Sequence, residues 1–132
     1  MNLRCALSAI FLAPSAVLAC VPALPGAKVV ESSRFAVAYR TQPERIAVGK
    51  HFTVDLAVCS KDGTPPPESV RVDAHMPEHR HGMNYKARVV PAAGGHYRAD
   101  GLMFHMPGRW EFIFDVRSAG KTDRLTQSQV LE

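Results

Sequence analysis

Beyond Cys20, the sequence has no apolar run near the roughly 20 residues that a membrane-spanning helix needs. It also lacks any block of like charge. Its 16 Lys and Arg residues are scattered among 12 Asp and Glu residues, for a formal net charge of +4, and such a pattern is not typical of nucleic-acid binding. No stretch shows the period of an amphipathic helix. We therefore expect no transmembrane segment in the mature chain, no nucleic-acid partner and no helical bundle.

Apolar residues concentrate at the N-terminus. Arg4 supplies a positive charge, an apolar stretch follows from Ala6 to Leu18, and the small residue Ala19 comes next. A positive start, a short apolar core and small residues before a cleavage point are typical of a secretory signal peptide. We predict that residues 1–19 are removed on export and that the mature protein is periplasmic.

Cysteine is scarce, and only Cys20 and Cys59 would remain after cleavage. An even number of cysteines in an exported domain favours a disulfide. Cys20 also resembles the lipidated first residue of a lipoprotein, although Leu18 is bulky for that motif and residues 21–25 are apolar rather than a polar tether. We predict a Cys20–Cys59 disulfide, with a lipoprotein anchored through Cys20 as the alternative.

Groups that carry catalysis are also scarce. If the two cysteines pair, no thiol is free to act as a nucleophile. No serine lies in the main histidine cluster, so no catalytic triad is indicated. Gly94-Gly95 is too short to cradle a phosphate and no helix is expected after it. We predict that the protein is not an enzyme.

What the sequence has in abundance is period-two alternation between turn residues. Ten prolines and nine glycines separate short runs in which apolar and polar residues alternate, as expected for strands with one buried face. After an N-terminal arm at residues 20–34, the domain at 35–132 holds about seven such runs, at 35–39, 52–59, 70–76, 84–91, 96–104, 109–116 and 122–131. The pattern predicts an all-β, immunoglobulin-like antiparallel β-sandwich with Trp110 as the main core anchor.

Histidine and methionine gather in two short segments, Met76 to Met83 and Met103 to Gly108. Each segment follows a predicted strand, and antiparallel pairing brings both to the same end of the sandwich. In an extended chain residues two apart point the same way, although Gly82 could interrupt this. The candidate metal ligands are His79, His81, Met83, His105 and Met106.

This ligand set favours copper. Thioethers suit Cu(I), and imidazole accepts both copper oxidation states. Zinc usually recruits cysteine or carboxylate beside histidine, and only Glu78 is at hand. Calcium and magnesium need oxygen ligands that the cluster lacks.

A structural explanation for the same residues stays open. His79 and His81 could serve only to hydrogen-bond loop carbonyls. Met76 is in register with the core residues of its strand, and His75 is expected on the solvent side. We expect His51 and His96 to lie away from the cluster.

These motifs resemble the YtkA-like domain family and, more weakly, FixH. The resemblance spans about residues 35–118 and is carried by motif positions in both His/Met segments: Met76, Pro77, His79, His81, Gly82, Met106, Gly108 and Trp110. It implies an exported immunoglobulin-like domain, and it suggests copper handling or the assembly of respiratory oxidases.

The sequence therefore supports two hypotheses about function. The first is a periplasmic domain that binds or delivers copper through the His/Met loops. The second is a metal-free interaction or assembly domain that uses the same loops to contact a protein partner of the envelope or of a respiratory complex.

Overall fold

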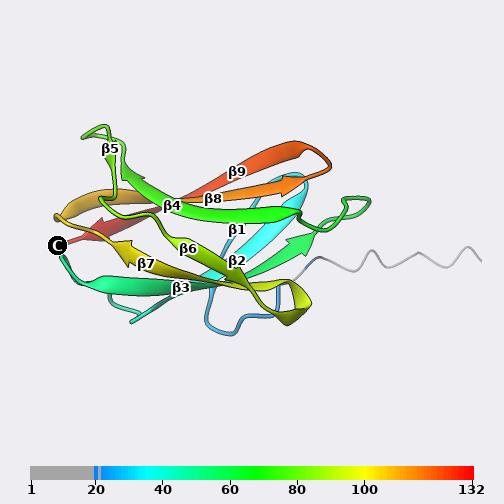
Figure 1. The fold of residues 1–132 in the computed structure, drawn as a ribbon, viewed down its shortest axis with the longest axis horizontal. Helices are drawn as coiled ribbons and strands as arrows, with labels where there is room; N and C mark the ends of the chain where they lie inside the picture. Colours follow the sequence, from blue (N-terminus) through cyan, green and yellow to red (C-terminus); the bar gives the residue numbers. More distant parts are fainter. Residues whose placement is uncertain (1–19, 21) are drawn as a thin grey trace, which may run out of the picture.

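Two antiparallel sheets pack face to face in the computed structural model, which describes Cys20 and residues 22–132 (Figure 1). The predicted signal peptide lies outside these described residues. The five-stranded sheet has the order β1 (Lys28–Glu31), β2 (Phe35–Gln42), β3 (His51–Ser60), β7 (His96–Met103), β6 (Arg88–Pro91). The four-stranded sheet has the order β5 (His81–Gly82), β4 (Ser69–Met76), β8 (Gly108–Ser118), β9 (Lys121–Leu131). No helix of the described part is long and apolar enough to cross a membrane.

The strand order confirms the predicted immunoglobulin-like sandwich. Without the short strands β1 and β5, the sheets read β2-β3-β7-β6 and β4-β8-β9, which is the ABED and CFG arrangement of immunoglobulin domains. The described residues hold nine strands instead of the expected seven. The two additions are β1, which lies within the predicted arm and pairs with β2, and β5, which lies in the first His/Met segment.

One predicted strand, at residues 84–91, is shorter in the structure. β6 begins only at Arg88 and pairs with β7 from Arg88 opposite Asp100 to Pro91 opposite Tyr97. The ladder stops beside Gly101, whose φ of +86° bends β7. The register between β3 and β7 shifts at the same place. The β6–β7 pairing therefore ends where β7 is irregular.

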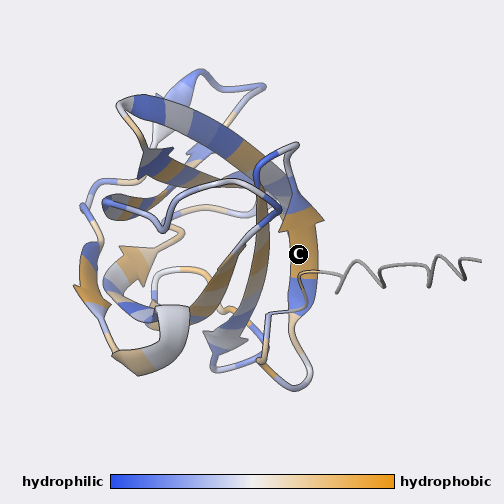
Figure 2. Ribbon diagram, turned by 90° about the vertical axis from the view of Figure 1, so that its right-hand side faces the viewer, coloured by the Kyte–Doolittle hydropathy of each residue, from blue (hydrophilic) through white to orange (hydrophobic). Residues whose placement is uncertain are grey.

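The core follows from the alternation along each strand, which Figure 2 shows as bands of opposite hydropathy. Trp110 is fully buried and has the largest side chain among the fully buried residues, as predicted. It stacks on Phe104, with ring centroids 4.4 Å apart and planes inclined by 6°. Such offset aromatic contacts add to the free energy gained by burying apolar area.

The N-terminal arm is fastened to the outer face of the five-stranded sheet. Cys20 forms the predicted disulfide with Cys59 near the end of β3, so its sulfur is not free to carry a lipid anchor. The Arg40 guanidinium also donates a hydrogen bond to the Pro25 carbonyl (3.2 Å). Ala36 and Ala38 on β2 face away from the core cluster yet are buried. The arm therefore acts as a cover for this part of the sheet.

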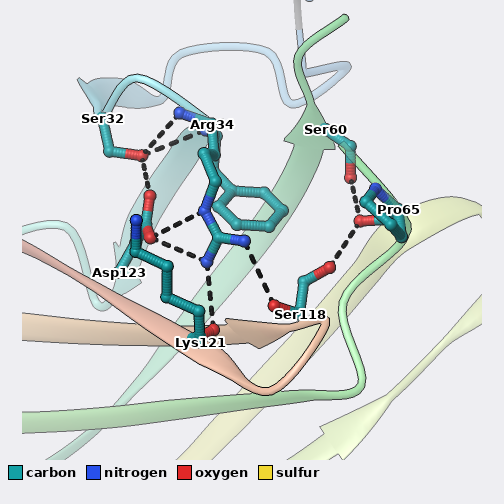
Figure 3. Close-up of polar contacts among 8 residues, drawn as sticks. Ser32, Arg34, Ser60, Pro65, Ser118, Lys121 and Asp123 are labelled. Carbon is teal, nitrogen blue, oxygen red and sulfur yellow. Dashed lines mark hydrogen bonds and ion pairs between the residues drawn. The ribbon is translucent and has the colours of Figure 1, made fainter. Parts of the chain in front are cut away.

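A polar network holds together the end of the sandwich opposite the His/Met loops (Figure 3). Arg34 forms an ion pair with Asp123 (2.8 Å) and donates to the Ser118 and Lys121 carbonyls. Ser32 donates a 2.6 Å hydrogen bond to the same carboxylate. These hydrogen bonds hold the pKa of Asp123 below the ordinary range of an aspartate.

Replacing Asp123 with asparagine should lower the free energy of unfolding by about 1.5–3 kcal/mol at neutral pH, since it weakens charge-assisted hydrogen bonds. Because the pKa of Asp123 is lower in the folded state, its ionised carboxylate stabilises the fold at pH values above the unfolded-state pKa of about 3.9. This stabilisation is lost as the pH falls through the folded-state pKa. Urea denaturation between pH 7 and pH 2 should therefore show the D123N deficit shrinking on acidification. Asp62→Asn, at an exposed turn position, is the control. A deficit that stays constant with pH would contradict this role.

Candidate metal site

The two His/Met segments meet at one end of the sandwich, as antiparallel pairing predicted. The first lies between β4 and residue 83 and includes β5, and the second connects β7 to β8. The imidazole centroids of His81 and His105, which belong to different segments, are 5.1 Å apart. His79 also lies next to His81, with a centroid distance of 5.8 Å. The structure thus brings three of the predicted ligands close to one another.

A tight turn, rather than strand alternation, brings His79 next to His81. The Met76 carbonyl accepts hydrogen bonds from the amides of both His79 (3.2 Å) and Arg80 (2.9 Å). Arg80 has a φ of +56°, a conformation uncommon for residues other than glycine. The break in the extended chain is therefore at Arg80 and not at Gly82. Glu78, which belongs to this turn, forms a 3.0 Å ion pair with Arg109 of β8 and so ties the segment to the sheet.

Trp110 forms the floor of the cluster. Its ring meets His81 and His105 edge-on, with centroid distances of 5.9 Å and 5.3 Å. Its indole Nε1 donates a 3.0 Å hydrogen bond to the Met106 carbonyl, which positions the second segment. Gly108 lets the chain pass close to the core here, because a Cβ at this position would come within 2.8 Å of the Met76 methyl group. Its φ of +123° also favours glycine.

The hydrogen bonds of the two central imidazoles indicate which nitrogens are free. His81 Nδ1 lies 3.0 Å from the Gly82 carbonyl. Since a carbonyl can only accept, Nδ1 carries the proton, and in the neutral ring the lone pair is then on Nε2. His105 Nδ1 is buried and has no hydrogen-bond partner among the residues that the structure describes. Buried polar atoms without a partner are rare in native proteins and call for an explanation.

The two predicted sulfur ligands lie closer to the core than expected. Met83 and Met106 are half-buried and pack against the hydrophobic cluster, whereas His79 is exposed. Met76 is 1% exposed and belongs to the core, as its strand register predicted.

No group of three or more His, Cys, Asp or Glu side chains in the described residues is placed to hold a metal ion. A surface hollow of about 490 Å³ lies between Glu44–Ile46 and the end of β9, and none of the predicted ligands lines it. The candidate site is therefore a surface cluster.

Comparison with protein families gives a match to the YtkA-like family model over residues 30–115. The chain belongs to the YtkA-like family. The matched region contains all five candidate ligands and Cys59 but not Cys20, so the disulfide joins the family domain to a preceding segment.

A solved structure with a similar fold is that of a DUF4426 family protein from Pseudomonas aeruginosa. The two are 13% identical in sequence with a TM-score of 0.50, and the match covers 81% of this chain and 97% of the other. At this identity the likeness concerns the fold alone. The search of curated proteins found no match.

Among the remaining histidines of this YtkA-like chain, the predicted position of His51 is wrong. His75 is on the outer side of β4, as expected, and pairs with Glu111 of β8 at 3.0 Å. His96 begins β7 at the opposite end of the sandwich. His51, expected far from the cluster, lies at the same end and is opposite Met103 in the β3–β7 ladder. The reason is that β3 and β7 are neighbours in the sheet although 35 residues separate them in the chain.

Proposed function

We propose that this YtkA-like protein binds Cu(I) in the periplasm through His81 and His105, with His79, Met83 and Met106 as additional ligands. The observation that carries the proposal is the adjacent pair of imidazoles from two segments, one with Nε2 free of hydrogen bonds and the other with a buried nitrogen that has no partner among the described residues. A metal ion shared by the two rings would supply that partner. The protein would act in copper binding or delivery and not as an enzyme.

The spacing of the rings fits a shared ion. A metal–nitrogen bond of about 2.0 Å puts each imidazole centroid about 3 Å from the metal, so two coordinated rings have centroids about 5–6 Å apart. The observed distances of 5.1 Å and 5.8 Å lie in this range. Ligation by His81 through Nε2, with Nδ1 donating to a carbonyl, is also the usual arrangement of metal-bound histidine.

The surroundings favour a soft monocation over zinc. Glu78, the one carboxylate of the first segment, is engaged by Arg109, and the neighbouring Arg80 adds positive charge. Two imidazoles and a thioether suffice for Cu(I), which accepts soft, low-coordinate sites. The exposed His79 beside the half-buried His81 offers a route for ligand exchange with a partner.

Export supports copper chemistry at this site. The predicted signal peptide directs the chain out of the cytoplasm, and the Cys20–Cys59 disulfide fits an oxidising compartment. Surface sites that rely on histidine and methionine remain usable where thiols are oxidised.

An anaerobic Cu(I) titration in competition with a colorimetric Cu(I) chelator tests this proposal. In the variant with both His81 and His105 changed to alanine, the affinity of this site should fall at least 100-fold, since each ligand contributes several kcal/mol in a small donor set. His79→Ala should have a smaller effect, because its side chain is at the exposed edge.

His75→Ala is the matched control, because His75 lies at the same end of β4 but its Nε2 contacts the Glu111 carboxylate. Thermal unfolding of each variant separates ligand loss from misfolding. If the wild-type protein fails to compete with the chelator, or the double variant competes as well as the wild type, the proposal is wrong. The metal-free interaction domain then becomes the better explanation.

A further inference from the structure

A second His/Met pair lies on the outer face of the five-stranded sheet. His51 opens β3 and Met103 ends β7, and the two residues are directly opposed in the antiparallel ladder. Their neighbours Phe52 and Leu102 are buried in the core, so alternation turns His51 and Met103 to the outer face. Directly opposed residues have Cβ atoms about 4.5–5.5 Å apart. The imidazole and the thioether are thus within reach of one ion.

The hydrogen bond of His51 leaves a ligand nitrogen free. His51 Nδ1 lies 3.3 Å from the Leu102 carbonyl. Because a carbonyl can only accept, Nδ1 carries the proton, and in the neutral ring the lone pair is on Nε2. The contact also fixes the ring on the strand that carries Met103. His51 is exposed and Met103 is half-buried, so an ion can approach from solvent.

An aromatic ring closes one side of this pair. The Tyr85 ring meets His51 edge-on with a centroid distance of 5.0 Å, although Tyr85 itself is 48% exposed. A tyrosine ring packed beside the imidazole can shield a bound monocation from water on that side. The contact orders Tyr85, which precedes β6 and belongs to no strand.

We propose that His51 and Met103, shielded by Tyr85, form a second Cu(I) site. A site with only two ligands, one imidazole and one soft thioether, suits Cu(I), which accepts low coordination numbers. It suits neither zinc nor calcium. The site is additional to the His81/His105 site and does not depend on it. In Figure 1, β3 begins and β7 ends at the end of the sandwich where β5 lies. The two sites therefore share one end of the molecule, which would let copper enter at one and move to the other.

Stoichiometry distinguishes the two sites. When titrated with Cu(I) in the presence of the competing chelator, the wild-type protein should bind two ions and His51→Ala should bind one. The double variant H81A/H105A should also retain one. In that variant, Ag(I), a stand-in for Cu(I) that does not oxidise in air, should shift the His51 Nε2 resonance in a histidine-labelled NMR spectrum.

Met103→Leu, which keeps the volume of the side chain, should also take up one Cu(I) ion. This variant tests the site even if His51→Ala does not fold. His96→Ala, at the other end of β7, is the matched control. Full wild-type stoichiometry in both His51→Ala and Met103→Leu would overturn this proposal. So would complete loss of binding in either His51→Ala or H81A/H105A alone, because it would mean one composite site. A third outcome is that H81A/H105A takes up as much Cu(I) as the wild type, whereas His51→Ala and Met103→Leu take up less. In that case this second site stands and the proposed function at His81 and His105 fails.

Discussion

Replacing Trp110 with alanine should lower the free energy of unfolding by about 3–5 kcal/mol, the usual cost of removing a buried tryptophan. Trp110 is fully buried, stacks on Phe104 at 4.4 Å and donates a hydrogen bond to the Met106 carbonyl. The substitution leaves a cavity beneath the His/Met loops and an unsatisfied carbonyl. Urea denaturation followed by far-UV circular dichroism measures this loss.

Trp110→Phe separates packing from loop positioning. Phenylalanine keeps an aromatic ring against Phe104 but cannot donate to the Met106 carbonyl, so we expect a smaller loss of about 1–3 kcal/mol. Because Trp110 also supports His81 and His105 from below, both variants should weaken Cu(I) binding at that site. An alanine variant as stable as the wild type would contradict the role of Trp110 as core anchor.

Much of the fold follows from local patterns, because strands with one buried face impose a period of two on the sequence. β3, β4, β8 and β9 were predicted to within a few residues. β1 and β5 were not, and neither carries a clear signal. Val29 is 52% exposed beside the buried Val30, and β5 has only two residues. Both are edge additions that depend on a neighbouring strand for their pairing.

The candidate site shows the same division between local and non-local information. His81 and His105 could be placed together because their segments are linked by successive antiparallel strands. The contact between His79 and His81 depends on the left-handed backbone of Arg80, which no residue preference indicates. His51 and Met103 could not be paired, because chain order alone does not reveal that β3 and β7 are neighbours. An immunoglobulin strand order applied to the predicted strands would have revealed it.

Changing both Cys20 and Cys59 to serine should lower the free energy of unfolding by about 3–4 kcal/mol, the loop-entropy value for a closed loop of this size. The bond joins residues 39 positions apart, so its loss enlarges the unfolded ensemble. A local effect should accompany it. The arm would be released from the outer face, and the amides near Ala36 and Ala38 should exchange hydrogen faster.

Reduction of the wild-type protein is the internal control, since it should lower the thermal midpoint as far as the double serine substitution does. An intact mass about 2 Da below that of the reduced form verifies the bond beforehand. Equal midpoints for oxidised and reduced protein would show that the arm is held by other contacts. Cys59 is near the end of β3, whereas the His/Met loops lie where β3 begins, so Cu(I) affinity should not change. The disulfide variant thus tests stability separately from metal binding, because the bond and the proposed ligands sit at opposite ends of the sandwich.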